Sequence, residues 1–260
     1  MYKNLLVSIP TERSPQPVID GAISLAVRCK ARLDAVSVGY ETSSLPLVAE
    51  GGAAVASIFE VEREKALERA NAALAVFEAE AKRAGLTYSN RAISALQGEA
   101  AAILGATARL YDLSIVSQPE FSHDTFDNTL AQEILFQSGG PVLFMPYTFK
   151  GAFQAKRVGI CWDGSRVAAR AVHDAMPMLA QAEAITIITI NAGGIPADAS
   201  AAHLARYLSQ LNVPTETESL ETEKANIQSS ILSLAADDSL SLLVMGGYGH
   251  SRLKETVFGG

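Results

Sequence analysis

Two halves of the chain repeat the same order of strands and helices, and this repeat restricts the fold more than any other feature. Each half opens with a short β-rich run, Asn4–Ile9 in the first and Arg157–Trp162 in the second. A loop follows, and then a segment whose apolar residues recur every three or four positions, as in a helix with one buried face. Two similar units in tandem are therefore expected.

Strands alternate with helices through both halves. The run Ile185–Ile190 is almost entirely β-branched, which is typical of a parallel strand covered on both faces. Strands that alternate with helices form βαβ units with right-handed crossovers. We therefore predict two open, mostly parallel α/β sheets of five strands, each flanked by helices. The remaining strands are expected at Leu33–Val38, Thr87–Ser94, Leu113–Ser117, Pro141–Pro146, Pro214–Ser219 and Leu242–Gly246.

The longest predicted helix is Ser57–Ala84, with Ser57 as its N-cap and Gly85 as its C-terminal cap. The residues before it, Glu41–Ala56, are expected to form a mobile loop. Other helices are expected near Val18–Val27, Glu99–Leu110, Thr125–Phe136, Ala168–Leu179, Ala199–Leu211 and Glu223–Ala236.

The boundary between the halves is expected near Thr148–Ala155, which gives a domain at 1–150 and another at 155–260. The last helix and the fifth strand of the second half would fall beyond Gly260, since the repeat has not ended there. The second domain is therefore expected to be incomplete at its C-terminus.

The composition limits the classes of partner. The 260 residues are 48% hydrophobic and carry a net charge of −7, which argues against a broad basic surface for nucleic acid or anionic lipid. Cys29 and Cys161 are too few for a disulfide framework and suit a reducing compartment. No apolar run approaches the roughly 20 residues of a membrane helix, and no signal peptide is evident. A cytoplasmic protein without nucleic-acid or membrane partners is expected.

Glycines begin directly after the last strand of the second half. Met245 ends that strand, and Gly246 and Gly249 follow. Glycine allows positive φ and close approach of a ligand, and successive backbone N–H groups can bind an anion. Ligands of open α/β sheets bind at the carboxyl ends of strands, so the pattern predicts a phosphate site that Gly259 and Gly260 close. The alternative is a purely structural tight turn.

A single carboxylate follows the first strand of the second half. Asp163 is placed to accept a hydrogen bond from an exocyclic amine or a hydroxyl of a ligand. The alternative is that Asp163 or Ser165 only caps the following helix. The four histidines show no metal-ligand spacing, and no Ser-His-Asp or paired-carboxylate arrangement stands out. Neither a metal site nor a set of catalytic residues is predicted.

The tandem repeat, Asp163 and the spacing G-x-x-G-x9-G-G from Gly246 to Gly260 resemble the universal stress protein A family in its two-domain form. The resemblance implies an adenine nucleotide alpha hydrolase-like fold. It also implies a site for ATP, or for AMP or ADP, which Mg²⁺ commonly accompanies.

The resemblance assigns roles to individual residues. Asp163 would contact the adenine, Ile190 would line the base and ribose pocket, and Met245 would pack beside the nucleotide. The phosphates and the ribose would receive backbone N–H groups from Gly246, Gly249 and Gly259. Gly260 stands where the family has Ser or Thr, which removes a hydroxyl from the phosphate shell.

The first half departs from this pattern. Pro10 stands where the second half has Asp163, and Ser117–Glu120 replaces the glycine loop. Pro119 lacks an N–H donor, and Glu120 would repel phosphate. The first domain is interpreted as a degenerate nucleotide site, which leaves it free to serve as a scaffold or to bind a different ligand.

Three functions stay open for the whole chain: a nucleotide-responsive stress or regulatory protein, a slow ATP hydrolase, and a scaffold that binds no nucleotide. The family also implies an unidentified protein partner. The strand Val142–Met145 is expected to be an edge through which domains pair, either as a homodimer or as a pseudo-dimer within one chain.

Overall fold

The computed structural model of the chain describes residues 1–41, 52–120, 122 and 125–247. The chain divides into two compact units, Tyr2–Phe153 and Gln154–Gly260, the second of which also includes Met1. They are called the first and the second unit below, and each is described by itself.

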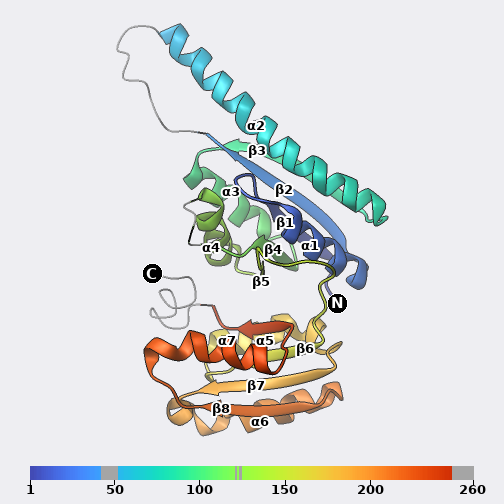
Figure 1. The fold of residues 1–260 in the computed structure, drawn as a ribbon, viewed down its shortest axis with the longest axis vertical. Helices are drawn as coiled ribbons and strands as arrows, with labels where there is room; N and C mark the ends of the chain where they lie inside the picture. The colour runs from blue at the N-terminus through green and yellow to red at the C-terminus, as the bar shows by residue number, and fades with distance from the viewer. Residues whose placement is uncertain (42–51, 121, 123–124, 248–260) are drawn as a thin grey trace. The chain divides into compact units, whose positions relative to one another are not determined.

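The first unit is a parallel sheet of five strands in the order β3-β2-β1-β4-β5 (Figure 1). The chain winds outward from β1 in both directions, and all strands end at the same edge of the sheet. The strands are β1 (Asn4–Ile9), β2 (Arg32–Tyr40), β3 (Tyr88–Ala95), β4 (Leu113–Ser117) and β5 (Val142–Met145). The helices are α1 (Gln16–Cys29), α2 (Gly52–Arg83), α3 (Gln97–Ala108) and α4 (Phe126–Ser138).

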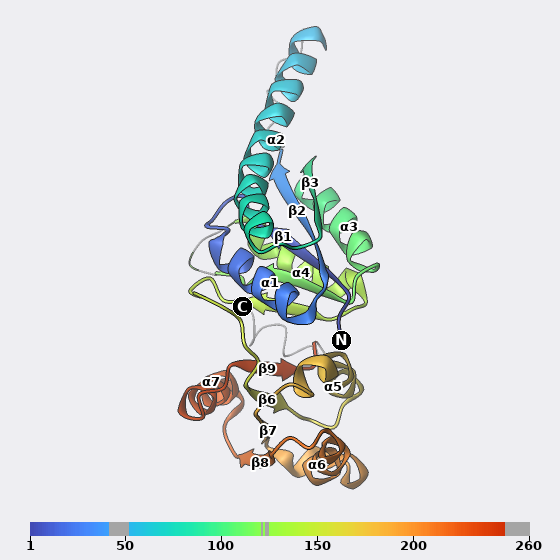
Figure 2. The same cartoon turned by 90° about the vertical axis from the view of Figure 1, so that its right-hand side faces the viewer.

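Helices cover both faces of this sheet. Helices α1 and α2 pack together on one face, and α3 and α4 pack together on the other (Figure 2). Neighbouring residues of a strand point to opposite faces, yet Leu5 and Leu6 of β1 are only 0% and 1% exposed. Burial on both faces explains why the parallel strands read as nearly continuous apolar runs.

Helix α2 lies closer to the sheet than an ordinary side chain would allow. A Cβ atom at Gly39 of β2 would overlap the backbone carbonyl oxygen of Ala66 in α2. The face of α2 that packs on the sheet carries three alanines and two large apolar residues, namely Ala66, Ala70, Leu74, Phe77 and Ala81. The glycine and the alanines bring the helix backbone onto the strand.

The start of α2 differs from the sequence prediction. The helix begins at Gly52, so the N-cap at Ser57 and the assignment of residues 52–56 to a loop were wrong. Alanine has the highest helix propensity, and residues 53–56 are three alanines and a valine, which extend the helix backward.

The second unit is a parallel sheet of four strands within the described residues, in the order β8-β7-β6-β9. Helices α5 and α6 lie on one face of the sheet and α7 on the other (Figure 2). The strands are β6 (Arg157–Cys161), β7 (Ala184–Ile190), β8 (Thr215–Leu220) and β9 (Leu242–Met245). The helices are α5 (Arg166–Leu179), α6 (Ala201–Leu208) and α7 (Ile227–Asp237), with short 3-10 turns at Ala192–Gly194, Ala197–Ala199, Ser209–Leu211 and Lys224–Asn226.

The predicted α/β class with two parallel sheets flanked by helices is confirmed. The second sheet has four strands within the described residues, and its fifth strand was expected beyond Gly260. Helix α7 begins at Ile227 rather than Glu223, because a 3-10 turn precedes it. None of the helices in the described part of the chain combines the length and the apolar run needed to cross a membrane.

Candidate functional site

Three neighbouring strands bring the predicted site residues of the second unit to one edge of the sheet. Strand β6 lies between β7 and β9, and Cys161 at its end pairs with Ile188 on one side and with Met245 on the other. Asp163 follows Cys161 by two residues, Ile190 is the last residue of β7, and Gly246 directly follows β9. Because the strands are parallel, these residues share the carboxyl edge of the sheet, where ligands of open α/β folds bind.

Asp163 begins the turn that leads from β6 into α5. Its Oδ1 accepts a hydrogen bond from the backbone N–H of Ser165 at 2.9 Å, and Gly164 between them has φ +71°. Ser165 is the N-cap of α5, and its Oγ accepts from the N–H of Ala168 at 3.2 Å. The capping role proposed for Ser165 is therefore present. Asp163 is exposed, so a ligand at the edge of the sheet could also reach its carboxylate.

Gly246 lies against the first turn of α5. A Cβ atom at this position would come within 2.7 Å of the Ala168 nitrogen and 2.8 Å of the Val167 carbonyl carbon. Close packing of the strand end on the helix is therefore sufficient to explain this glycine. The same closeness places the end of β9 beside the N-terminal end of α5, where the helix dipole favours negative charge.

Asn191 is a residue at this edge that sequence reasoning missed. It takes the left-handed conformation, with φ 52°. Its Oδ1 accepts from the N–H of Thr222, and its Nδ2 donates to the carbonyl oxygen of Thr222, both at 2.9 Å. This pair of bonds joins the loop after β7 to the loop after β8. The sequence signal was an asparagine directly after a strand, because asparagine tolerates left-handed backbone.

The surroundings of Cys161 disfavour the thiolate form of its side chain. Burial is the main cause that raises the pKa of the Cys161 thiol to about 12, and the negative charge of Asp163 acts in the same direction. At neutral pH the side chain stays protonated, whereas a nucleophilic cysteine needs its thiolate. The edge therefore offers a carboxylate and backbone groups, not a nucleophile at Cys161.

The structure places four of the seven predicted site residues. Asp163, Ile190, Met245 and Gly246 lie at the carboxyl edge, with Ile190 and Met245 partly buried. The other three residues, Gly249, Gly259 and Gly260, lie outside the described residues. Within the described part of the chain, no group of three or more His, Cys, Asp or Glu side chains is placed to hold a metal ion.

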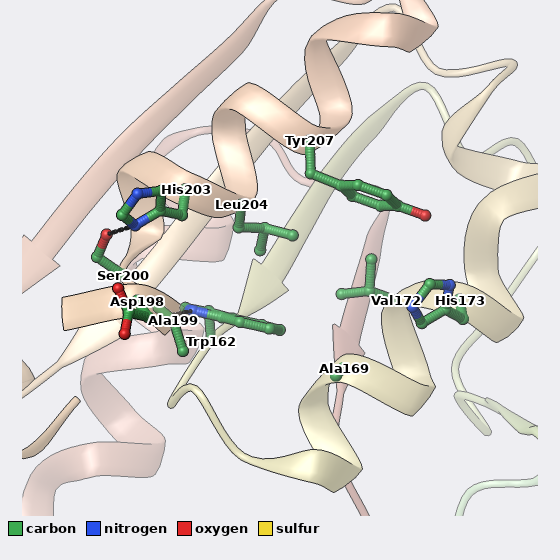
Figure 3. A pocket seen from close by; sticks show the side chains of 10 residues that line it. All are labelled: Trp162, Ala169, Val172, His173, Asp198, Ala199, Ser200, His203, Leu204 and Tyr207. Atoms are coloured by element: carbon green, nitrogen blue, oxygen red, sulfur yellow. Dashed lines mark hydrogen bonds between the residues drawn. The ribbon is translucent and has the colours of Figure 1, made fainter. Parts of the chain in front are cut away.

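A pocket of about 280 Å³ opens between α5 and α6 on one face of the same sheet. Figure 3 shows Trp162, Leu204, Tyr207, Val172 and Ala169 around its centre. The indole Nε1 of Trp162 donates to the carbonyl oxygen of Ala199 at 2.7 Å, which fixes the ring under the loop before α6. The remaining lining residues are His173, Asp198, Ala199, Ser200 and His203.

The first unit has a different arrangement at its own carboxyl edge. Asp127, in the first turn of α4, is 7% exposed. Its Oδ2 accepts from the backbone N–H groups of Thr11 at 3.1 Å and Glu12 at 2.9 Å. In return, Oε2 of Glu12 accepts from the N–H of Phe126 at 2.7 Å and of Asp127 at 3.3 Å. The carboxylate of Asp127 thus binds the backbone N–H groups of the loop after β1, and the carboxylate of Glu12 binds those at the N-terminus of α4.

Tyr40 completes this arrangement from the end of β2. Its hydroxyl donates to Oδ1 of Asp127 at 3.1 Å, and its ring packs on Phe126 with the centroids 5.2 Å apart. Burial raises the pKa of Asp127, while the backbone N–H of Glu12, the Tyr40 hydroxyl and the charge of Arg13 oppose that shift. Burial therefore disfavours the charged form of the Asp127 carboxylate, and three hydrogen-bond donors partly offset this effect.

Comparison with known proteins supports the fold of the chain but does not assign it a ligand or an activity. No family model and no curated protein matches the chain. A universal stress protein from Archaeoglobus fulgidus DSM 4304 matches with a TM-score of 0.69 and 14% identity, over 97% of this chain and 94% of that one. A putative universal stress protein from Pseudomonas aeruginosa UCBPP-PA14 matches with a TM-score of 0.52 and 14% identity, over 99% of this chain and 87% of that one.

A universal stress protein solved in complex with cAMP is also similar, over 55% of this chain and 96% of that one, with 18% identity. Its TM-score of 0.32 is too low to carry an argument about a ligand of this chain. The matches to the Archaeoglobus fulgidus and Pseudomonas aeruginosa proteins extend over both units of this chain. The chain therefore has the fold of the universal stress proteins along nearly its whole length.

Proposed function

We propose that the chain is an adenine-nucleotide-binding protein of the universal stress protein type, acting in a stress response or in regulation. The second unit would hold ATP, or AMP or ADP, and the first unit would hold none. The observation that carries this proposal is the gathering of Asp163, Ile190, Met245 and Gly246 at the ends of three adjacent parallel strands.

The chemistry of this edge suits the two ends of a nucleotide. Asp163 has an exposed carboxylate that can accept from the exocyclic amine of a base. On the neighbouring strand β9, Gly246 lies against the first turn of α5, and a helix N-terminus attracts phosphate. Gly249, Gly259 and Gly260 would supply further N–H donors, as the family pattern implies. Mg²⁺ would be held mainly by the phosphates, since Asp163 is the only acidic residue among the predicted site residues.

The filled edge of the first unit supports a single site per chain. The N–H groups at the start of α4, which an anion would need, already bind Glu12. Asp127 occupies the donors of the loop after β1 in the same way. A phosphate would have to displace one carboxylate and would meet the charge of the other, so we propose that this unit acts as a scaffold.

The first test is the nucleotide content of the purified protein, before and after incubation with Mg·ATP. The protein is denatured, and adenine nucleotides in the supernatant are counted per chain by anion-exchange chromatography. We expect about one per chain, and Asp163→Ala is expected to weaken adenine-nucleotide binding by about 1–3 kcal/mol through the lost hydrogen bond.

Asp237→Ala is the matched control for this variant. Asp237 ends α7, at the opposite end of the second unit from the strand ends, and the substitution removes the same charge. Two nucleotides per chain would contradict the proposal for the first unit. Absence of nucleotide, or unchanged affinity in Asp163→Ala, would contradict the proposal for the second. Release of phosphate from bound ATP would add slow hydrolysis to the function.

We also propose that domains pair through β5, as a homodimer or within one chain, in the cytoplasm. Strand β5 is an edge of the first sheet, and the apolar side chains of Val142 and Phe144 in this short strand are only partly buried. An unpaired apolar edge invites another strand. Analytical ultracentrifugation is expected to give twice the mass of one chain for a homodimer, whereas the mass of one chain would leave only pairing within the chain.

A further inference from the structure

The pocket between α5 and α6 adjoins the carboxyl edge, because its lining residue Trp162 directly precedes Asp163, but it is lined by other residues. We propose that it is a binding site for a small aromatic cation, a ligand with one ring and a positively charged amine. The inference does not rest on the proposed nucleotide function, because none of Asp163, Ile190, Met245 and Gly246 lines the pocket.

The centre of the pocket is apolar and aromatic. Trp162 is 8% exposed, Val172 is 2% exposed and Leu204 is 6% exposed, and together with Ala169 they surround the hollow seen in Figure 3. The hollow has a volume of about 280 Å³ and is open to solvent on one side, so a one-ring ligand fits into it. A one-ring ligand can therefore contact the part of the Trp162 side chain that remains exposed.

Two pairs of contacting side chains form the ends of the pocket. Tyr207, 42% exposed, meets His173 across the gap between α6 and α5, with ring centroids 5.8 Å apart in an edge-to-face arrangement. At the other end, Nδ1 of His203 lies 2.9 Å from the Ser200 hydroxyl and 3.0 Å from the carbonyl oxygen of Ala197. These contacts restrict the side chains before any ligand arrives, which lowers the entropic cost of binding.

The charge of the lining selects the class of ligand. Among the ten described lining residues, Asp198, which lies near Ser200 and His203 at one end of the pocket (Figure 3), is the only one with a permanent charge, and none is Lys or Arg. Arg170, the neighbour of Ala169, is turned to an ion pair with Asp174 at 2.8 Å. Indole and phenol rings attract cations through their π faces. A carboxylate and two electron-rich rings without a cation favour an ammonium and disfavour a phosphate or a carboxylate.

The test uses three probes that differ mainly in charge: benzylammonium, benzyl alcohol and benzoate. Trp162 is the single tryptophan of the chain and lines the pocket, so its emission reports on binding there, and titration calorimetry gives an independent affinity. We expect benzylammonium to bind about tenfold more tightly than benzoate, as one cation–π contact corresponds to about that ratio. Benzyl alcohol is expected to fall between them.

Three variants separate the pocket from non-specific binding. Asp198→Asn is expected to reduce the preference for the cation and to leave the binding of benzyl alcohol unchanged. Ala169→Leu fills the hollow from α5 and is expected to abolish binding of all three probes. Should circular dichroism show that this variant is unfolded, Tyr207→Ser removes a half-exposed wall instead. Ala202→Leu, an exposed position of α6 outside the lining, is the matched control.

The proposal is overturned when benzylammonium leaves the emission of Trp162 and the calorimetric baseline unchanged. It is also overturned when benzoate binds as tightly as benzylammonium, or when the folded pocket variants bind like the Ala202→Leu control. Unaltered benzylammonium binding in Asp163→Ala is expected, and a parallel loss there would assign the probe to the carboxyl edge and contradict a separate site.

Discussion

Gly39→Ala is expected to destabilise the first unit by about 3 kcal/mol or more, one of the two largest effects that we predict for a single substitution. The new methyl group would overlap the carbonyl oxygen of Ala66, which belongs to the backbone of α2 and has no rotamer to change. Helix α2 would have to move away from β2 and β3, and its buried Phe77 and Leu74 would lose their packing. Chemical denaturation followed by circular dichroism measures the effect.

Gly98→Ala is the matched control for Gly39→Ala. Gly98 lies in the first turn of α3, is exposed, and has no atom within 4 Å of the position of an added Cβ. Alanine there is expected to stabilise the protein by up to about 1 kcal/mol, because it restricts the unfolded chain and favours helix. Equal effects at the two positions would contradict the close contact between Gly39 and Ala66.

Asp127→Ala is expected to destabilise the first unit by about 3 kcal/mol. The substitution leaves the N–H groups of Thr11 and Glu12 and the Tyr40 hydroxyl without their acceptor in a buried place, and unsatisfied buried donors are costly. Asp127→Asn is expected to stay within about 1 kcal/mol of the wild type. The amide oxygen can accept from both N–H groups, and the amide nitrogen can donate to Tyr40.

The comparison between wild type and Asp127→Asn also has a definite pH dependence. Because burial raises the pKa of Asp127, the folded state holds this proton more tightly than the unfolded state does. The contribution of Asp127 to stability is therefore most favourable below the unfolded-state pKa, near 4, and is lost as pH rises through the folded-state pKa. Chemical denaturation at pH values from 7 down to 4 should show that the free energy of unfolding of the wild type rises relative to that of Asp127→Asn.

A difference in unfolding free energy that stays flat over this range would contradict the raised pKa of Asp127. Large destabilisation in Asp127→Asn at neutral pH would show that charge, rather than hydrogen bonding, holds the loop after β1 to α4. Glu41→Gln is a control, since it neutralises another carboxylate near the end of β2 without touching the donors of Thr11 and Glu12.

Most strands of the fold were predictable because their signal is local. Asn4–Ile9 and Leu113–Ser117 match β1 and β4 residue for residue, since an apolar run bounded by polar residues marks a buried parallel strand. The start of α2 was not predictable, because helix-forming alanines before Ser57 carry no start signal of their own. Only the close contact of Gly39 with Ala66 shows why β2 carries a glycine near its end.

The sequence by itself determined the two α/β repeats and the grouping of Asp163, Ile190, Met245 and Gly246, since each follows from order along the chain and from parallel strands ending at one edge. The tertiary structure alone decided the reciprocal hydrogen bonds of Glu12 and Asp127, which are separated by 115 residues. The carboxylate of each residue accepts from backbone N–H groups of the other's segment. The tertiary structure likewise decided the pocket beside Trp162, which needs α5 and α6 at a definite spacing. Periodicity records which face of an element is buried, whereas contacts between distant side chains depend on how the elements pack.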